Sequence, residues 1–351
     1  MSHGPIFVCG PSRSGTAMLR SALNGHSSVH IAGETHYFDD LRQRLEDPSS
    51  GVLSSELASE AVNYFGALSH RPYGHRGDPT QGWISPQQLR ERAEQLGGTG
   101  DAYFQAYCEI AAERASKSIW GEKTPRHIFR IDDILTKFPD AKVVCMSRDP
   151  RAVVASYRDS RSRGGFDFER DPGHREALEA DQNRIRRSYH PATISMLWRA
   201  QSNATLRARD QWGPEKVYLQ RYEDLVVEPE RKLRELAEWL GLSFEESMLE
   251  VPMHNSSYQR FDDKHGITRT AVDRWKTKLT PSEIRIVDRI CQSPMRSLGY
   301  EAEAPSPPSL NEYSLWARWP IAVASAAIAN RERSGGLVKY IYRRALLAFG
   351  K

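Results

Sequence analysis

The sequence predicts an α/β fold of the P-loop type, in which a parallel sheet is flanked by helices. Short apolar runs alternate with segments of helical periodicity along most of the chain, which is the pattern of successive βαβ units. A glycine-containing loop also joins the first apolar run to the first helical segment. With 351 residues, of which 39% are hydrophobic, the chain is long enough for one large α/β domain or two smaller ones.

The elements follow in order along the chain. The predicted strands are Ile6–Cys9, Val29–Ala32, Ser118–Gly121, Lys142–Met146 and Lys216–Gln220. The predicted helices are Thr16–Leu23, Asp101–Ala115, Arg126–Phe138, Pro150–Asp159, Ala192–Asp210 and Glu228–Trp239. The last helix has the clearest ends, because Pro229 can occupy its first turn and Gly241 follows it.

Two stretches, residues 46–100 and 161–190, are irregular and have little periodicity. Loops at the carboxyl ends of parallel strands line the ligand crevice of an α/β sheet. Both stretches are therefore interpreted as insertions on the substrate side of a domain that spans residues 1–305. Surface excursions without a role are the alternative.

Residues 306–351 are predicted to be a linker, Ser306–Ser309, followed by a basic, aromatic helical extension. Its final part, Leu337–Phe349, has apolar residues at helical spacing with basic residues between them. This tail could dock on the domain, pair with another chain in a homodimer, or make a peripheral contact with an anionic membrane. Docking or oligomerisation is favoured. The apolar stretch Pro320–Ala329 is too short to form a transmembrane segment.

The bulk composition limits the function classes. The formal charge of +4 and the isoelectric point near 8.8 fit an anionic small ligand, and no nucleic-acid partner is predicted. The four cysteines lack metal-ligand spacing, so neither a zinc site nor a disulfide framework is expected. The first residues lack the pattern of a signal peptide, which predicts a cytoplasmic protein.

The loop "GPSRSGT" resembles a nucleotide-binding P-loop without its lysine. In a nucleoside-triphosphate P-loop, the second glycine is followed by a Lys that reaches the phosphates and by a Ser or Thr that holds Mg²⁺. Here Thr16 takes the place of the lysine, and the run "VVCMS" leads to Arg148 instead of a metal-binding Asp. Backbone N–H groups from Arg13 to Ala17 can still bind an anion. A sulfuryl group, which carries less negative charge than a terminal phosphoryl group, would fit this loop without a metal ion, and Arg13 can bind it with a forked guanidinium.

A second motif, "SRDPRAVVASYRDSR", places basic and hydroxyl side chains after a strand. Arg148 and Ser156, together with either Arg158 or Arg161, could bind a second, dianionic phosphate. Pairing between an arginine and the aspartate within "RDPR" is the alternative.

Together, the two motifs resemble those of the sulfotransferases that use 3′-phosphoadenosine 5′-phosphosulfate (PAPS). The segments "WGEKTPRHI" and "VYLQRYEDLVVEPERKLRELAEWLGL" resemble two further segments of that family, so the likeness extends from Ile6 to Leu242. The resemblance implies a sulfotransferase-like fold, PAPS as co-substrate, adenosine 3′,5′-bisphosphate as product, and no metal. It assigns the 5′-phosphosulfate to the loop residues Ser12, Arg13, Ser14, Gly15, Thr16 and Ala17. It assigns the 3′-phosphate to Arg148 and Ser156.

Within the family, the likeness is nearest to the tyrosylprotein sulfotransferases and the bacterial members. Their "RSGT" is followed about twenty residues later by an acid in a "GE-T" context, which here is "AGETHYF". The resemblance implies Glu34 as the general base, with His36 as the nearby rival. It implies that Lys123, with Arg13, stabilises the oxygen that leaves the sulfuryl group.

The resemblance also implies two further contacts with the nucleotide. Tyr222 matches a tyrosine that contacts adenine, although a core tyrosine at a strand end is the alternative. The segment His265–Leu279 resembles a loop that closes over the nucleotide, in which Arg269 and Thr270, together with Arg274 and Lys276, are candidates for phosphate contacts.

The predicted function is transfer of a sulfuryl group from PAPS to a hydroxyl acceptor. A carbohydrate, lipid or small natural product is favoured as the acceptor, with peptidyl tyrosine as the alternative. Two other classes remain open: a kinase on a degenerate P-loop, which would need Mg²⁺ and ATP, and a binding protein that kept the fold without activity.

Overall fold

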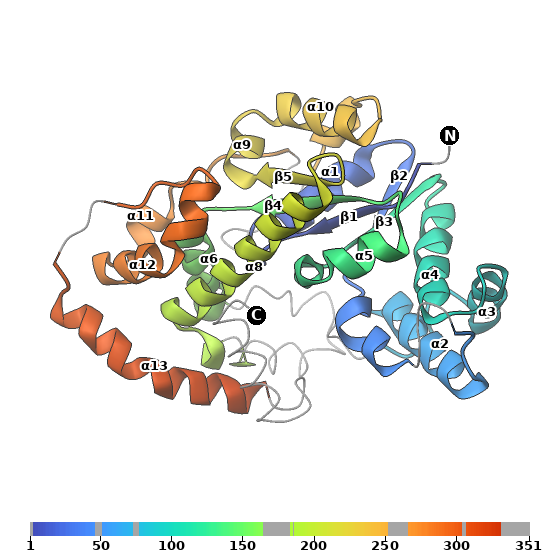
Figure 1. Ribbon diagram of the computed structural model, residues 1–351, viewed down its shortest axis with the longest axis horizontal. Coiled ribbons are helices and arrows are strands. Elements are labelled where there is room, and N and C mark those ends of the chain that lie inside the picture. The colour runs from blue at the N-terminus through green and yellow to red at the C-terminus, as the bar shows by residue number, and fades with distance from the viewer. Residues whose placement is uncertain are drawn as a thin grey trace.

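The computed structural model describes residues 3–45, 51–72, 77–163, 183–184, 186–251, 266–303 and 307–330. Within these residues, a parallel sheet has the strand order β2-β3-β1-β4-β5 (Figure 1). The strands are β1 (Ile6–Cys9), β2 (Val29–Ala32), β3 (Ile119–Lys123), β4 (Lys142–Ser147) and β5 (Val217–Arg221). The predicted α/β class, with helices flanking a parallel sheet, is confirmed.

Helices connect the strands and cover the sheet (Figure 1). The α-helices are α1 (Thr16–Gly25), α2 (Ser55–His70), α3 (Pro86–Gln95), α4 (Gly100–Arg114), α5 (Ile131–Lys137), α6 (Pro150–Arg163), α8 (Pro191–Trp212), α9 (Tyr222–Val227), α10 (Pro229–Leu240), α11 (Trp275–Lys278), α12 (Pro281–Ser297) and α13 (Leu310–Ala329). The other helical turns are η1 (Tyr37–Leu41), η2 (Arg42–Arg44), η3 (Pro125–Phe129) and η5 (Glu246–Leu249).

The side chains of the central strand β1 alternate between two hydrophobic cores. Phe7 and Cys9 belong to the core that contains residues of α2, α4 and α5. Ile6 and Val8 belong to the core that contains residues of α1, α9 and α10. Both faces of the sheet are therefore buried, which explains why its strands read as continuous apolar runs in the sequence. A third core joins α6, α8, α11 and α12.

The strand predictions agree closely with the structure, whereas the predicted helix Arg126–Phe138 is wrong as a single element. Its place is taken by the 3₁₀ turn η3 and the α-helix α5. Arg130 lies between η3 and α5, and its φ of −124° and ψ of 14° are not helical. The first element therefore ends before the second begins. Pro125 opens η3 because its fixed φ suits a first helical position.

The prediction that residues 46–100 are irregular is also wrong for much of that stretch, because α2 and α3 lie within it. Both helices have serine caps: the side chain of Ser54 accepts a hydrogen bond from the N–H of Leu57, and that of Ser85 from the N–H of Gln88. The buried face of α2 includes Ala58 and Ala61, small residues that give only a weak apolar period. Residues 46–50 and 73–76 lie outside the described residues.

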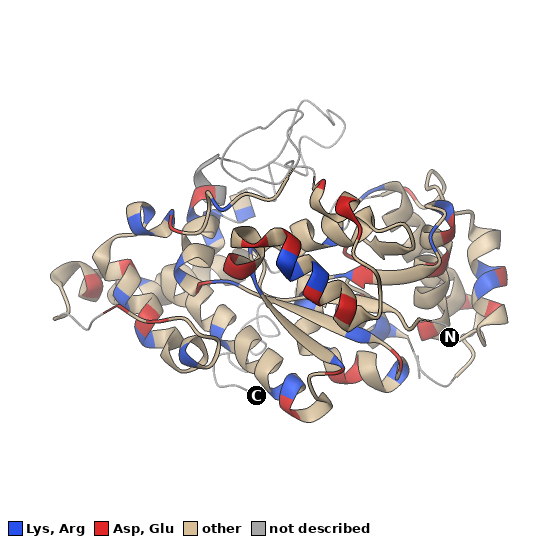
Figure 2. Ribbon diagram, turned by 90° about the horizontal axis from the view of Figure 1, so that it is seen from above, with Lys and Arg blue, Asp and Glu red and all other residues tan. Residues whose placement is uncertain are grey.

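Most of the second predicted insertion, residues 164–182 and 185, also lies outside the described residues, as does the predicted helix Leu337–Phe349. The extension does contain α13, whose Leu315, Trp316 and Trp319 pack against the third core. On the same helix, the buried Glu312 accepts a hydrogen bond of 2.9 Å from Nε of Arg285. In the view of Figure 2, charges of both signs are interspersed along the helices. None of the helices described here combines the length and the hydrophobicity that a membrane span needs.

Candidate functional site

The loop between β1 and α1 is shaped by backbone conformations that few residues adopt. Arg13 and Gly15 have φ angles of 73° and 86°. At Gly15, a Cβ atom would lie 2.7 Å from the ring of Tyr222, so this position requires glycine for space as well as for conformation. Gly15 caps α1, and among the described residues no backbone carbonyl accepts from the N–H groups of Gly15, Thr16 and Ala17. The loop thus presents donors at a helix N-terminus, as an anion site requires.

Two arginines join this loop to the second motif. Nε of Arg13 donates a hydrogen bond of 3.0 Å to Oγ of Ser156 on α6. Arg148, which follows β4 and is only 6% exposed, donates from Nη1 to the carbonyl of Arg13 at 2.8 Å and lies 4.3 Å from the ring centroid of Tyr222. The structure therefore brings Arg13, Arg148, Ser156 and Tyr222 together at the carboxyl ends of β1, β4 and β5.

The polar groups of this corner are not fully satisfied by the protein. Within the described part of the chain, Nε of Arg148 and Oγ of Ser14 are buried and have no hydrogen-bond partner. Among the described residues, Arg148 hydrogen-bonds to two carbonyls and packs against an aromatic ring, and its charge also acts on the nearby carboxylate of Glu223. The alternative, Arg–Asp pairing within "RDPR", is found between Arg151 and Asp149 at 2.7 Å, and Arg148 is not part of that pair. A buried cation with this surrounding is suited to an anionic ligand.

Other predicted contributors lie farther from this arrangement. Arg158 donates to Oε2 of Glu283 at 2.9 Å, so it is engaged by α12. The side chain of Arg161 lies outside the described residues. Arg269 and Thr270 are exposed, and it is the carbonyl of their neighbour Ala271 that accepts from Nη2 of Arg148, at 2.9 Å. The segment is therefore next to the loop, but no contact of the Arg269 or Thr270 side chain with the loop is seen among the described residues.

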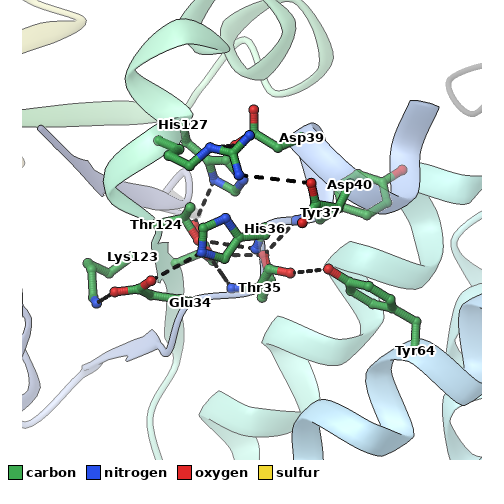
Figure 3. A network of polar contacts seen from close by, with 12 residues as sticks. Glu34, Thr35, His36, Tyr37, Asp39, Asp40, Tyr64, Lys123, Thr124 and His127 are labelled. Carbon is green, nitrogen blue, oxygen red and sulfur yellow. Dashed lines mark hydrogen bonds and ion pairs between the residues drawn. The ribbon is translucent and has the colours of Figure 1, made fainter. Parts of the chain in front are cut away.

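On the other side of the loop, three side chains form a connected group (Figure 3). Glu34, beyond the end of β2, accepts from Nζ of Lys123 at 2.5 Å through one oxygen. Its other oxygen lies 3.1 Å from Nε2 of His36. The side chain of Glu34 is 37% exposed, whereas those of Lys123 and His36 are 8% and 7% exposed. The carboxylate is thus the most accessible member of the group.

This environment determines the protonation state of Glu34. Burial favours the protonated form, but the hydrogen bond from His36 and the charge of Lys123 outweigh it and lower the pKa of Glu34 to about 2. Glu34 is therefore ionised at neutral pH. The same contact holds the ammonium group of Lys123 at the carboxylate of Glu34.

Glu122, which is fully buried on β3 next to Lys123, is not among the site residues predicted from the sequence. One oxygen of Glu122 accepts from the N–H and the hydroxyl of Thr35, both at 2.9 Å, and also from the hydroxyl of Thr124. The other oxygen lies 3.0 Å from Nδ1 of His127. Despite burial, which favours the protonated form, the charge and hydrogen bond of His127 and the other donors lower the pKa of Glu122. The one signal in the sequence is a charged residue placed at the end of an otherwise buried strand.

Comparison with known proteins shows the family of the chain. A model of the sulfotransferase family matches residues 5–246. Mouse carbohydrate sulfotransferase 2 is 29% identical over 188 residues, which cover 46% of this chain and 35% of that protein. A putative protein-tyrosine sulfotransferase of Caenorhabditis briggsae is 23% identical over 323 residues, which cover 89% of this chain and 93% of that protein.

A solved structure, the sulfotransferase domain from the curacin biosynthetic pathway, is similar in fold. It has a TM-score of 0.52 and 21% identity, and the match covers 85% of this chain and 98% of that domain. The chain spans about a third of the length of the first curated relatives that it matches, with covered shares of 31% and 35%. The family match covers well over half of the chain. This protein belongs to the sulfotransferase family.

Proposed function

We propose that the protein transfers a sulfuryl group from PAPS to a hydroxyl of its acceptor, with Glu34 as general base. The observation that carries the proposal is the meeting of two groups at one sheet edge: an anion-binding loop with Arg13 and Arg148, and an ionised carboxylate with a buried lysine. Family membership supports sulfuryl transfer in general. The donor, the base and the acceptor class are proposals about this chain.

The residues of the loop fit the donor. The N–H groups of Gly15, Thr16 and Ala17 and the hydroxyl of Ser14 would hold the phosphosulfate end, together with Arg13. Arg148 and Ser156 would hold the 3′-phosphate, which would supply Nε of the buried guanidinium with the hydrogen-bond acceptor that it lacks among the described residues. When bound, PAPS supplies a sulfuryl group whose leaving group is adenosine 3′,5′-bisphosphate.

Three side chains of the protein would then have separate roles in the transfer. Glu34 would accept the proton of the acceptor hydroxyl, because it is ionised and partly exposed. His36 is the weaker candidate for the base: its ring is buried and hydrogen-bonds to the carboxylate, so it orients Glu34. The ammonium group of Lys123 has three hydrogen-bond donors. Together with Arg13, it would stabilise the charge that develops on the departing oxygen.

We propose a carbohydrate, lipid or natural-product hydroxyl as the acceptor, with carbohydrate first. The similarity to mouse carbohydrate sulfotransferase 2 supports this order. So does Asp40 in η1, the turn after the base, because this carboxylate lies 4.0 Å from Nη1 of the half-exposed Arg126. Carboxylate and guanidinium groups can hydrogen-bond several hydroxyls of one acceptor. A panel of carbohydrate, lipid, phenolic and tyrosyl-peptide acceptors with labelled PAPS, read by mass shift, tests the class; exclusive modification of the peptide would overturn it.

The decisive variant for the base is Glu34→Gln, which keeps the shape of the side chain and removes its charge. We expect kcat to fall by roughly 10²–10⁴-fold, while the Kd of adenosine 3′,5′-bisphosphate stays nearly unchanged. Glu245→Gln is the matched control, because Glu245 pairs with Ser27 and His26 near the start of β2 and not with this site. Wild-type turnover in Glu34→Gln would reject the assignment.

A further inference from the structure

The buried carboxylate of Glu122 connects the two segments that carry the proposed chemistry. Glu34 immediately precedes Thr35, which donates both its N–H and its hydroxyl to Glu122. Lys123 immediately follows Glu122 on β3. One fully buried side chain therefore links the turn that holds the base to the strand that holds the lysine, one residue away from each.

The register of the sheet explains why this link is possible. Ala32 of β2 pairs with Glu122 of β3, so the chain leaving β2 passes beside the end of β3. The segments beyond the two strand ends would otherwise be free to separate, because regular pairing stops at this position. The hydrogen bonds of Glu122 continue the connection past the last paired residues.

Two further residues complete the network (Figure 3). The hydroxyl of Thr124 donates to Glu122 and accepts from the N–H groups of Thr35 and His36, at 3.1 and 3.3 Å. His127 fixes the second oxygen of Glu122 from η3. His36 is held in this way with φ 51°, a left-handed conformation that non-glycine residues rarely adopt without support from their surroundings.

The chemistry of Glu122 is unusual for a residue that only supports the fold. A carboxylate with no exposed surface costs free energy unless hydrogen bonds and an opposite charge compensate it. The contacts given above to Thr35, Thr124 and His127 come from the segments around the proposed base and lysine, and from no more distant part of the chain.

We propose that Glu122 is a positioning residue for sulfuryl transfer: by bonding Thr35 and His127 it fixes the carboxylate of Glu34 against the ammonium of Lys123. This inference rests on the proposed roles of Glu34 and Lys123. Glu122 itself does not reach the substrate, since it is fully buried. It acts through Thr35 and the strand end.

The test is a double-mutant cycle in the full chain, with sulfuryl transfer from labelled PAPS as the activity. Glu122→Gln is expected to lower kcat by roughly 10–100-fold and to change the Kd of adenosine 3′,5′-bisphosphate by less than about 3-fold. In the Glu34→Gln background, the same substitution is expected to lower kcat by less than about 3-fold, because its effect passes through Glu34. Equal losses in both backgrounds would overturn the inference.

Thr35 offers a second pair of variants in case Glu122→Gln does not fold. Thr35→Val removes the hydroxyl but keeps the shape, and a loss of kcat of roughly 10-fold is expected. Thr35→Ser keeps the hydroxyl, so near wild-type kcat is expected. Equal activity of these two variants would contradict the positioning role.

A matched control separates positioning from stability. Glu312 is also a buried glutamate held by hydrogen bonds, here from Arg285, but it lies on α13, away from the sheet edge. Glu312→Gln is expected to lower the melting temperature with kcat unchanged. If Glu122→Gln behaves in the same way, Glu122 is structural only. Wild-type turnover in the single variant Glu34→Gln would reject both the proposed base and this inference. If Glu34→Gln lowers kcat but the losses from Glu34→Gln and Glu122→Gln are additive in the double variant, only the positioning role is rejected.

Discussion

The ion pair between Lys123 and Glu34 leads to a prediction that does not depend on activity. We consider Lys123→Met, which keeps most of the side-chain volume and removes the charge. The ammonium lies 2.5 Å from the carboxylate and contributes to lowering the pKa of Glu34 from 4.5 to about 2. An opposite charge this close lowers a carboxyl pKa by about 1–3 units, so its removal should return the pKa of Glu34 to roughly 3–5.

The sign of the pH effect follows from the lowered pKa. Because Glu34 has a lower pKa in the folded state than in the unfolded chain, its contribution to stability is complete above pH 4.5 and disappears as the pH falls towards 2. At pH 4, a group with a pKa of about 2 is about 1% protonated, whereas one with a pKa of 4 is half protonated. The variant should therefore lose this contribution at a higher pH than the wild type.

The measurement is a carbon-13 NMR titration of the glutamate carboxyl groups between pH 7 and 3.5. The Glu34 signal is identified by its absence in Glu34→Gln. We expect it to stay nearly constant in the wild type and to titrate in Lys123→Met. Lys117→Met is the control, because Lys117 precedes β3 and donates to carbonyls at the opposite end of that strand. A wild-type Glu34 that titrates near pH 4.5, or a variant with no new titration, would refute the reasoning.

The same variant separates the two functions assigned to Lys123. A higher pKa makes Glu34 a stronger base, which by itself would favour proton transfer. Loss of the ammonium removes stabilisation of the departing oxygen, a change that typically costs roughly 10²–10³-fold in kcat. We therefore expect a net loss of kcat in Lys123→Met. An unchanged or increased kcat would mean that Lys123 serves only to hold the base.

Two further predictions concern the donor side. Arg148→Ala should weaken binding of adenosine 3′,5′-bisphosphate far more than binding of the analogue without the 3′-phosphate, as measured by calorimetry; equal losses for both would reject a 3′-phosphate site. Gly15→Ala should destabilise the loop by about 1–3 kcal/mol, because its φ of 86° is strained for alanine and the new Cβ would lie 2.7 Å from the ring of Tyr222. Its thermal unfolding and nucleotide affinity would both fall, and unchanged values would show that the loop adapts.

The fold was predictable where the physical signal is local. The strands are buried on both faces and therefore appear as uninterrupted apolar runs, which explains why Ile6–Cys9 and Val29–Ala32 were predicted with their observed bounds. The helix α2 was missed because alanines on its buried face contribute little to an apolar period. The break at Arg130 was missed because it accompanies a tertiary contact, that of His127 with the buried Glu122.

The sequence predicted which residue types belong to the candidate site, but it did not predict which residues contact one another there. Motifs that follow parallel strands meet at the carboxyl edge of a sheet, which explains the approach of Arg13 to Ser156, 143 residues apart. The roles of these residues in binding and catalysis stay predictions. Arg158 shows the limit of the pattern, because its sequence position suits a phosphate contact but its partner is Glu283 on α12. The contacts of Glu122 had no pattern in the sequence, since they depend on the register between β2 and β3.

The register between β1 and β3 also changes how the loop after β1 is understood. A nucleoside-triphosphate P-loop takes its lysine from the position that Thr16 occupies here. In this sheet, Val8 of β1 pairs with Lys123 of β3, so an ammonium group is supplied from the neighbouring strand, one residue before the end of β1. A lysine in the loop can hold only the donor, whereas Lys123 also binds the proposed base. In the proposed mechanism, Lys123 would therefore couple the donor side of the site to the acceptor side, a connection that the loop position could not provide.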